Sequence, residues 1–331
     1  MLIKYSSPIY SCRDASYLRH AAYCKTFNVR IVPSARLCVR FFSLLALSVF
    51  LSCAALSSNV SAQENPVSFQ AVAAVEPVWQ TFADNIDFFH AKTLDPQLEF
   101  WALRVDLNSP NTQIVVRGGA QSNDSDTLST KVSGFVRDND LLAGINTVPF
   151  DIVTSKEGQP IKNMGIVISG GKLIAPANRN YDALVFYKDG KAAIVSQSSL
   201  QSTENIENAA GGFHKILADG QPAERTQNRE DRHPRSAAGI SADGSYLYLL
   251  VIDGRRAGSV GSTEKETALI LRSLGSWEGI NFDGGGSSAL ALRYEDGRVR
   301  TVNTPIHGGI PNQERAVAGC LGVSFNPSTE K

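Results

Sequence analysis

Short hydrophobic runs separated by glycine-rich or polar turns follow one another through most of the chain. Residues 98–107 alternate between apolar and polar side chains, which predicts a strand with one buried face. Residues 246–252 are apolar almost throughout, which is typical of a strand in the middle of a sheet. Asp189-Gly190 joins two further apolar runs and predicts a hairpin. The pattern therefore favours a sheet built largely from hairpins.

Two segments have the hydrophobic spacing of helices. Thr263 stands three residues before Glu266 and ahead of apolar residues at helical spacing, which predicts a helix with a capping box. Gly275 predicts where this helix ends. The carboxylate of Glu266 is explained by capping and is not a catalytic candidate. A second, shorter helix is predicted over residues 129–137, with Ser129 as its cap.

These elements together predict an α+β fold with few helices and a twisted sheet that is mixed or mostly antiparallel. No linker-like segment divides residues 76–326, so we expect one domain there, followed by a short tail over residues 327–331.

The region before that domain has the pattern of an export signal. Arg36 and Arg40 precede an apolar run over residues 41–56, and Val60-Ser61-Ala62 follows as a small-residue cleavage pattern. We therefore predict an N-terminal extension with a signal peptide over residues 1–62, the signal itself at 35–62, and a flexible leader over residues 63–75.

Two alternatives for the apolar run stay open: an uncleaved membrane anchor, and lipid attachment at Cys53. Four of the five cysteines precede the predicted cleavage point, which leaves Cys320 alone and excludes an intrachain disulfide in the mature chain. We expect the mature protein to be secreted or periplasmic and not to insert stably into a membrane. A membrane-anchored protein is the alternative.

The charge balance limits the choice of partners. The chain has 32 Lys and Arg residues and 32 Asp and Glu residues, so no overall field attracts nucleic acid or an anionic membrane. With one mature cysteine and no CxxC pair, a structural zinc site is not expected. We expect no cofactor, although calcium or magnesium on Asp253 and Asp283 is left open.

Residues 279–292, GINFDGGGSSALAL, form the segment with the richest candidate chemistry. Three glycines, Gly284 to Gly286, permit positive φ and close approach of the backbone to a ligand. The turn would present backbone N–H groups and two serine hydroxyls, with Asp283 as its only charge. A glycine-rich hairpin that merely turns the chain is the alternative.

Other polar residues stand at strand ends or in tight turns. Asp253 and Arg255 follow the apolar strand 246–252, and pairing with each other would be their structural explanation. If that strand and the one before Asp283 are parallel neighbours, the two aspartates lie at one edge of the sheet. Arginines with backbone amides suit a phosphate, and paired carboxylates suit chemistry at a glycosidic carbon. His214 has no evident partner and is expected to be structural.

Four ordered segments are similar to the phosphodiester glycosidase family: HPRSAAGI, LYLLVIDGRR, GSTEKETALILRSLGSWEGINFDGGGSSALAL and ERAVAGCLGV. An animal member of this family removes N-acetylglucosamine from phosphodiester-linked mannose. The resemblance implies that residues 76–326 are a catalytic domain. It also implies that the pocket residues are Arg235, Asp253, Arg255, Asn281, Asp283, Gly284, Gly285 and Ser287, together with Asn146 and Arg315.

The chain departs from the family pattern in AGINTVPFD, where Thr147-Val148 replace paired glycines. This departure leaves the natural substrate open. We interpret the chain as an exported hydrolase that cleaves a bond of the N-acetylglucosamine-1-phosphodiester type in a small or polymeric glycoconjugate. Asp283 is the expected carboxylate at the anomeric centre, and Asp253 is its partner or the residue that orients an arginine.

Two other functions fit the same residues. A non-catalytic carbohydrate-binding protein of the envelope would use the arginines and turns for binding alone. A metal-dependent phosphodiesterase would cleave the P–O bond, with the aspartates as metal ligands.

Overall fold

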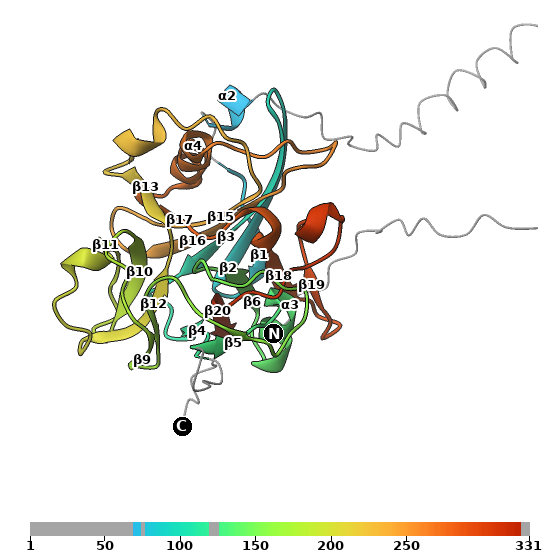
Figure 1. Cartoon of the computed structure of the whole chain (residues 1–331). Coiled ribbons are helices and arrows are strands. Elements are labelled where there is room, and N and C mark those ends of the chain that lie inside the picture. The colour runs from blue at the N-terminus through green and yellow to red at the C-terminus, as the bar shows by residue number, and fades with distance from the viewer. Residues whose placement is uncertain (1–68, 74–76, 119–125, 326–331) are drawn as a thin grey trace, which may run out of the picture. The chain divides into compact units, whose positions relative to one another are not determined.

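The largest sheet has eight strands in the order β1-β2-β3-β16-β15-β17-β13-β14, and every pair of neighbours in it is antiparallel (Figure 1). Its strands are β1 (Gln80–Ala83), β2 (Ile86–Leu94), β3 (Gln97–Asp106), β13 (His214–Ala218), β14 (Gln221–Pro222), β15 (Arg235–Ile240), β16 (Tyr246–Ile252) and β17 (Glu278–Asn281). The expected mostly antiparallel arrangement is confirmed.

Among the residues that the structure describes, two five-stranded sheets and a two-stranded one accompany the large sheet. One has the order β11-β10-β12-β8-β9, with β8 (Val167–Ser169), β9 (Lys172–Ala175), β10 (Asp182–Tyr187), β11 (Ala192–Ser196) and β12 (Ile206–Gly211). The other has the order β19-β18-β6-β20-β4, with β4 (Thr112–Val116), β6 (Ala143–Asn146), β18 (Leu290–Arg293), β19 (Val299–Thr301) and β20 (Cys320–Phe325). The pair is β5 (Thr127–Leu128) with β7 (Pro160–Ile161).

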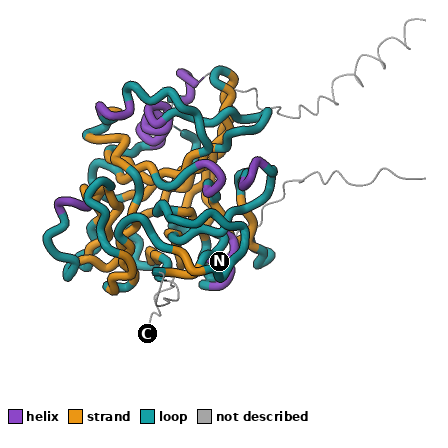
Figure 2. The backbone as a smooth tube through the Cα atoms, viewed as in Figure 1, coloured by secondary structure: helices purple, strands orange, loops and turns teal. Residues whose placement is uncertain are grey.

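Helices are few among the described residues, as Figure 2 shows. The computed structural model describes residues 69–73, 77–118 and 126–325, so the predicted signal peptide lies outside them. The α-helices are α2 (Phe69–Val72), which falls within the predicted leader, α3 (Val132–Asp138) and α4 (Glu264–Leu274). Short 3-10 turns are η1 (Gln197–Ser199), η2 (Glu224–Thr226), η3 (Gly285–Ser287) and η4 (His307–Gly309).

Strand β16 is apolar throughout because both of its faces are covered. Leu249 and its alternate neighbours join a core cluster shared with the two five-stranded sheets. Leu250 and its alternate neighbours join a second cluster, which includes Leu271 of helix α4. Successive side chains of a strand point to opposite faces, so the residues of β16 pack alternately into one core or the other, with Tyr246 only partly buried. The large sheet therefore lies between α4 and the other sheets.

Helix α4 has the predicted ends. The Thr263 side chain accepts a hydrogen bond from the Glu266 N–H, and the Glu266 carboxylate accepts one from the Thr263 N–H. Gly275 ends the helix with a φ of 111°.

Helix α3 differs at its start from the expectation. It begins at Val132 after Lys131, whose side chain does not cap it, and the carboxylate of Glu314 accepts the Ser133 N–H at 2.9 Å instead. Ser129 is not its cap, because the Ser129 hydroxyl donates to the carbonyl of Lys156 at 2.8 Å and accepts from the Gln159 N–H. A contact with a distant loop has replaced the local cap.

The strands before Asp253 and Asp283 are parallel to each other but are not neighbours. Strand β15 lies between β16 and β17 and runs antiparallel to both. The two aspartates are therefore at the same edge of the sheet, as expected, but a whole strand separates them.

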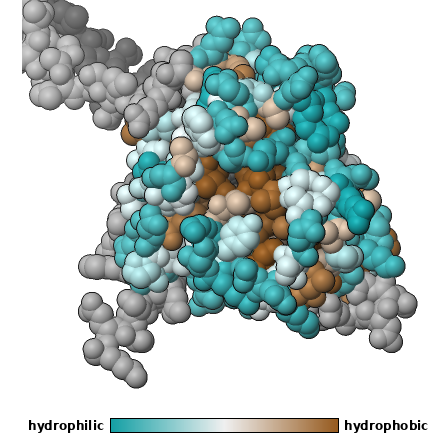
Figure 3. Space-filling view, turned by 90° about the vertical axis from the view of Figure 1, so that its left-hand side faces the viewer, coloured by the Kyte–Doolittle hydropathy of each residue, from teal (hydrophilic) through white to brown (hydrophobic). Residues whose placement is uncertain are grey.

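Figure 3 shows the face of the molecule that carries β9 to β13, where hydrophobic side chains gather near the middle and hydrophilic ones frame them. Within the described ranges, no helix has both the length and the apolar character needed to span a bilayer. The described residues all belong to one unit of the chain.

Candidate active site

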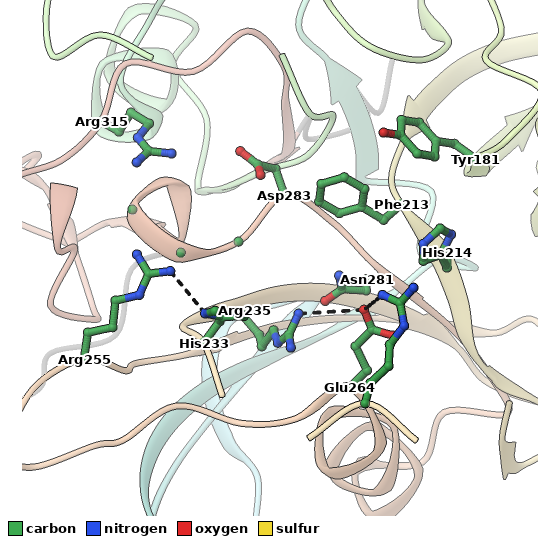
Figure 4. Close-up of a pocket in the computed structure, with 14 residues that line it drawn as sticks. Tyr181, Phe213, His214, His233, Arg235, Arg255, Glu264, Asn281, Asp283 and Arg315 are labelled. Carbon is green, nitrogen blue, oxygen red and sulfur yellow. Dashed lines mark hydrogen bonds and ion pairs between the residues drawn. The ribbon is translucent and has the colours of Figure 1, made fainter. Parts of the chain in front are cut away.

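A cavity of about 510 Å³ opens at the edge of the large sheet where β17 ends. Because β13 and β15 run antiparallel to β17, their first residues, His214 and Arg235, lie at the same edge as Asn281, the last residue of β17. The residues around the cavity are Tyr181, Phe213, His214, Arg229, His233, Arg235, Arg255, Glu264, Asn281, Asp283, Gly284, Gly285, Gly286 and Arg315 (Figure 4).

Alternation along the chain brings two predicted residues into the cavity. Phe282 is fully buried in the core, so Asn281 and Asp283, one position before and after it, project to the other side. The main chain of Asp283 is fixed on both sides: its N–H donates to the Thr147 carbonyl at 2.8 Å, and its carbonyl accepts from the Asn146 amide at 2.6 Å.

Asn146 is fully buried and does not line the cavity, contrary to the prediction that it binds substrate directly. Its Oδ1 accepts hydrogen bonds from the Ser236 hydroxyl at 2.6 Å and from the Ala289 N–H at 3.1 Å. Asn146 therefore ties β6 to the main chain of Asp283. It thereby holds in place the main chain that carries the Asp283 carboxylate.

Thr147 and Val148, where the chain departs from the family pattern, are accommodated by a glycine. A Cβ on Gly319 would lie 2.9 Å from Thr147 Oγ1 and would collide with Val148. Both side chains are buried, and Thr147 meets Asp283 through its backbone carbonyl. The side chains of Thr147 and Val148 are therefore packed in the interior and do not line the cavity.

The carboxyl group of Asp283 has an unusual proton affinity. Burial raises its pKa to about 6, while the hydrogen bond from the Ser287 side chain, the charge of Arg315 and the Gly284 N–H act in the opposite direction. The group can therefore change its protonation state near neutral pH, which is common for carboxyl groups at functional sites.

The glycine turn lets two arginines approach the backbone. Gly285 has a φ of 63°, and a Cβ there would lie 3.2 Å from the guanidinium of Arg255. A Cβ on Gly286 would collide with the guanidinium of Arg315. A Cβ on Gly284 would lie 2.8 Å from the carbonyl of Pro234, which accepts the Gly285 N–H. All three glycines are required by close packing.

Arg255 and Arg315 have no carboxylate partner in the part of the chain that the structure describes. Arg255 Nη2 lies 3.1 Å from His233 Nδ1, and Arg315 Nε donates to His307 Nδ1 at 3.1 Å. Burial and the nearby arginines lower the pKa of both histidines, which favours neutral imidazoles. Arg315 also donates to the Ser287 hydroxyl at 3.1 Å. Both guanidinium groups remain available to an anion.

Arg235 is held more tightly by the protein. Its Nε donates to the Ser262 carbonyl at 3.1 Å, and its Nη2 donates to the Asp231 carbonyl at 3.0 Å. Its Nη1 lies 3.9 Å from the carboxylate of Glu264, which also accepts from Arg229 at 3.1 Å. Arg235 lines the cavity as predicted, but two of its three side-chain nitrogens already donate to backbone carbonyls.

Asp253 does not line the cavity. It is 1% exposed, and its carboxylate accepts hydrogen bonds from Arg256 Nε at 2.8 Å, Asn303 Nδ2 at 3.1 Å and the Thr304 N–H at 3.1 Å. Its ion-pair partner is thus Arg256 and not Arg255. Of its two expected roles, the geometry favours orienting an arginine over direct contact with substrate.

The pairing of Asp253 with Arg256 determines where Arg255 points. Arg256 is held by Asp253 and also by Glu99 of β3. Arg255, the residue before it, has a φ of 58° and extends into the cavity (Figure 4). The buried ion pairs therefore fix a turn with a positive φ, which costs a non-glycine residue energy unless the surroundings hold it.

Several cavity residues were not predicted from the sequence. His214, expected to be structural, lines the cavity, and its buried Nδ1 has no hydrogen-bond partner in the structure. Tyr181, Phe213 and Glu264 also line it. No group of three His, Cys, Asp or Glu residues within the described ranges is arranged to hold a metal ion.

One curated protein is similar to part of the chain. The chain is 29% identical over 174 residues to an SPbeta prophage-derived uncharacterized protein of Bacillus subtilis, an alignment that covers 49% of this chain. It spans about a quarter of the length of that relative, 26%.

Two solved structures have the same fold. The zebrafish N-acetylglucosamine-1-phosphodiester alpha-N-acetylglucosaminidase catalytic domain, auto-inhibited by its pro-peptide, matches with a TM-score of 0.55 and 20% identity, over 79% of this chain and 87% of that one. A hypothetical protein from Synechocystis matches with a TM-score of 0.56 and 14% identity, over 76% of this chain and 65% of that one.

The sequence model of phosphodiester glycosidases matches residues 110–324, which include the glycine turn, Asp283 and both free arginines. That match covers well over half of the chain. The protein therefore belongs to the phosphodiester glycosidase family.

Proposed function

We propose that the protein hydrolyses the glycosidic bond of a phosphodiester-linked sugar, of the N-acetylglucosamine-1-phosphodiester type. One observation carries the proposal: the carboxyl group of Asp283 lines the same cavity as two guanidinium groups, Arg255 and Arg315, that have no carboxylate partner among the described residues. A guanidinium matches the oxygens of a phosphate, and a carboxylate suits a developing positive charge on a sugar.

The arginines and the carboxylate stabilise different charges as the bond breaks. As the bond between the anomeric carbon and the phosphate oxygen breaks, negative charge gathers on the phosphate, where Arg255 and Arg315 stabilise it. Positive charge gathers on the sugar ring, where the ionised carboxylate of Asp283 stabilises it. A phosphate leaves readily as an anion, so the reaction needs no strong general acid. Water forms the new bond to the anomeric carbon and loses a proton to solvent, which gives the free sugar and the phosphate monoester.

Asn146 and the glycine turn hold this arrangement before substrate arrives. The Asp283 main chain is fixed by Asn146 and Thr147, and Arg315 is fixed by Ser287 and His307. Charges that are already in place need no reorganisation during the reaction, which is the main advantage of an enzyme site over water. This fixed geometry and the family membership are the support for the proposed function.

We further propose that the protein is exported, to the periplasm or outside the cell. The support is the signal-peptide pattern over residues 35–62, which precedes the described part of the chain. N-terminal sequencing of protein recovered from cells that express the full chain tests this: we expect Gln63 as the first residue. A first residue before position 35 would contradict it.

Hydrolysis of two substrates tests the proposed activity. UDP-N-acetylglucosamine and the methyl phosphodiester of N-acetylglucosamine 1-phosphate are incubated with wild type and with Asp283→Asn, with and without chelator, and the products are resolved by mass. We expect free N-acetylglucosamine from wild type alone, unaffected by chelator. Release of sugar phosphate, or loss of activity in chelator, would instead support a metal-dependent phosphodiesterase.

Binding without turnover would favour a different function. If both proteins bind the methyl phosphodiester equally well and neither cleaves either substrate, the chain acts as a carbohydrate-binding protein of the envelope. A glutamine variant of Lys172, which is exposed on β9 and does not line the cavity, serves as the control and should keep wild-type activity.

A further inference from the structure

The cavity has two chemically different sides, and Asp283 lies between them (Figure 4). Arg255, Arg315 and the glycine turn form one side, where positive charge and backbone dominate. Tyr181 and Phe213 lie on the opposite side of Asp283, beside His214. The proposed function uses only the first side.

Three rings form a continuous wall on the second side. The ring of Tyr181 meets that of Phe213 edge-on at 5.4 Å and that of His214 at 6.1 Å. Phe213 is anchored to the large sheet because its N–H donates to the carbonyl of Asn281 at 2.8 Å. Tyr181 directly precedes β10, so the wall joins residues of two sheets. Aromatic rings of this kind offer an apolar surface with a negative face, which suits the C–H groups of a sugar ring.

Three buried polar atoms next to this wall have no hydrogen-bond partner in the structure: His214 Nδ1, Asn281 Oδ1 and Glu264 Oε2. Asn281 is 2% exposed and Glu264 is 4% exposed, so water reaches them only through the cavity. Buried polar groups in proteins are nearly always hydrogen-bonded, and an exception requires an explanation. Asn281 Oδ1 and Glu264 Oε2 are acceptors, so they lack donors, whereas His214 Nδ1 donates or accepts according to its tautomer.

We propose that this second side, formed by Tyr181, Phe213, His214, Asn281 and Glu264, binds the ring of an uncharged, hydroxylated sugar. The sugar packs a C–H face on the aromatic wall, donates hydroxyl or amide hydrogens to Asn281 Oδ1 and Glu264 Oε2, and forms a further hydrogen bond with His214 Nδ1. This inference rests on the proposed function, because it places the sugar on one side of Asp283 and the phosphate on the other. The five residues of the second side then determine which sugar the site binds.

The sugar side has little capacity for a second anion. Arg235 uses Nε and Nη2 on backbone carbonyls, and its Nη1 faces Glu264. Arg229 donates to the same carboxylate. The positive charge there is therefore already engaged with Glu264, in contrast to the free guanidinium groups across the cavity. A small site with a few fixed polar groups on an apolar wall is typical of recognition of an uncharged ligand.

Separate probes for the two sides test the inference without requiring turnover. Binding of N-acetylglucosamine, glucose and methyl phosphate is measured by ligand-observed NMR for wild type, Phe213→Leu, Asn281→Leu and Arg315→Gln, each purified from cells expressing the full chain. We expect the Phe213 and Asn281 variants to bind N-acetylglucosamine about fivefold to tenfold more weakly. Their affinity for methyl phosphate should stay within about twofold of wild type, and Arg315→Gln should show the reverse pattern.

Asn281→Leu also distinguishes a ligand-binding role from a structural one. The side chain of Asn281 makes no hydrogen bond to the described part of the protein, so replacing it with an apolar side chain of similar size should leave Tm unchanged or raise it. A structural residue would lower Tm when replaced. Lower sugar affinity together with an equal or higher Tm is therefore the expected combination.

Three results would overturn the inference. The first is unchanged sugar binding in both Phe213→Leu and Asn281→Leu. The second is equal weakening of sugar and methyl phosphate in either variant at wild-type Tm, and the third is a wild type that binds neither sugar. A wild type that binds both kinds of probe on separate sides but hydrolyses no substrate would refute the proposed function and leave this inference intact. Hydrolysis by wild type together with unchanged sugar binding in the variants would support the proposed function and refute this inference.

Discussion

The side-chain amide of Asn146 donates to the main-chain carbonyl of Asp283 at 2.6 Å, although 137 positions separate the two residues. Asn146 belongs to β6 of a five-stranded sheet, whereas Asp283 follows β17 of the large sheet. The position of the proposed catalytic carboxylate is therefore determined by a residue that cannot touch the substrate.

Replacing Asn146 should reduce both activity and stability. Asn146→Ala leaves the Ser236 hydroxyl, the Ala289 N–H and the Asp283 carbonyl without their partner, and each lost bond to a buried group costs about 1–3 kcal/mol. We expect kcat to fall at least about tenfold and unfolding to require less denaturant. Ser236→Ala removes only one of the bonds and should cost less on both measures. Equal losses in the two variants would contradict the positioning role.

The activity should depend on the protonation of Asp283. Its pKa of about 6 lies within the working range, and only the ionised carboxylate stabilises positive charge on the sugar. We expect kcat/KM for UDP-N-acetylglucosamine to rise with pH through about 6 and then level off. A profile that falls through pH 6 would mean that the protonated acid is the active form.

The same group should make stability depend on pH. Burial raises the pKa of Asp283 from 3.8 to about 6, so the folded protein binds more protons than the unfolded chain between about pH 4 and pH 6. This contribution to the free energy of unfolding is therefore present at low pH and is lost as pH rises through 6. Asp283→Asn carries no such group.

Denaturant unfolding of the two proteins at several pH values checks this. Relative to wild type, we expect Asp283→Asn to become steadily more stable from pH 4 to about pH 7 and to show no further gain above that. A stability difference that stays constant over this range would show that Asp283 is not protonated more readily in the folded state.

Asp253 should act through Arg255. Asp253→Asn weakens the hold on Arg256, which fixes the turn that directs Arg255 into the cavity. We expect lower kcat/KM in Asp253→Asn and in Arg255→Ala, and little further loss when the two changes are combined, because both remove the same guanidinium from its place. Fully multiplicative losses would indicate that Asp253 has a separate catalytic role.

Local patterns in the sequence predicted much of this structure. The glycine turn around Asp283 and the capping box of Thr263 and Glu266 depend on neighbouring residues, and both are present as expected. The order of the strands is different, because it depends on pairings between distant segments. The sequence left open whether β16 and β17 are neighbours, and it did not indicate that β15 lies between them and pairs antiparallel with both.

The same limit explains the missed cavity residues. His214 reaches the site because it is paired with Asn281 across β13 and β17, and Tyr181 reaches it from a different sheet. No spacing in the sequence expresses either relationship. Likewise, Asp253 forms its ion pair with Arg256 across a turn in which Arg255 has a positive φ. The sequence Asp-Gly-Arg-Arg alone does not show which of the two arginines is the partner of Asp253.

The aromatic wall connects two separately hydrogen-bonded sheets, because Tyr181 precedes β10 and His214 begins β13. A ligand on this wall would contact both parts at once and add to the backbone hydrogen bonds by which Phe213 links Asp182 of β10 to Asn281 of β17. Binding would then slow backbone amide exchange in the segment between β12 and β13, far more than a phosphate bound to the arginines alone. Substrate binding would thus reduce the motion of the two sheets relative to each other before the bond is cleaved.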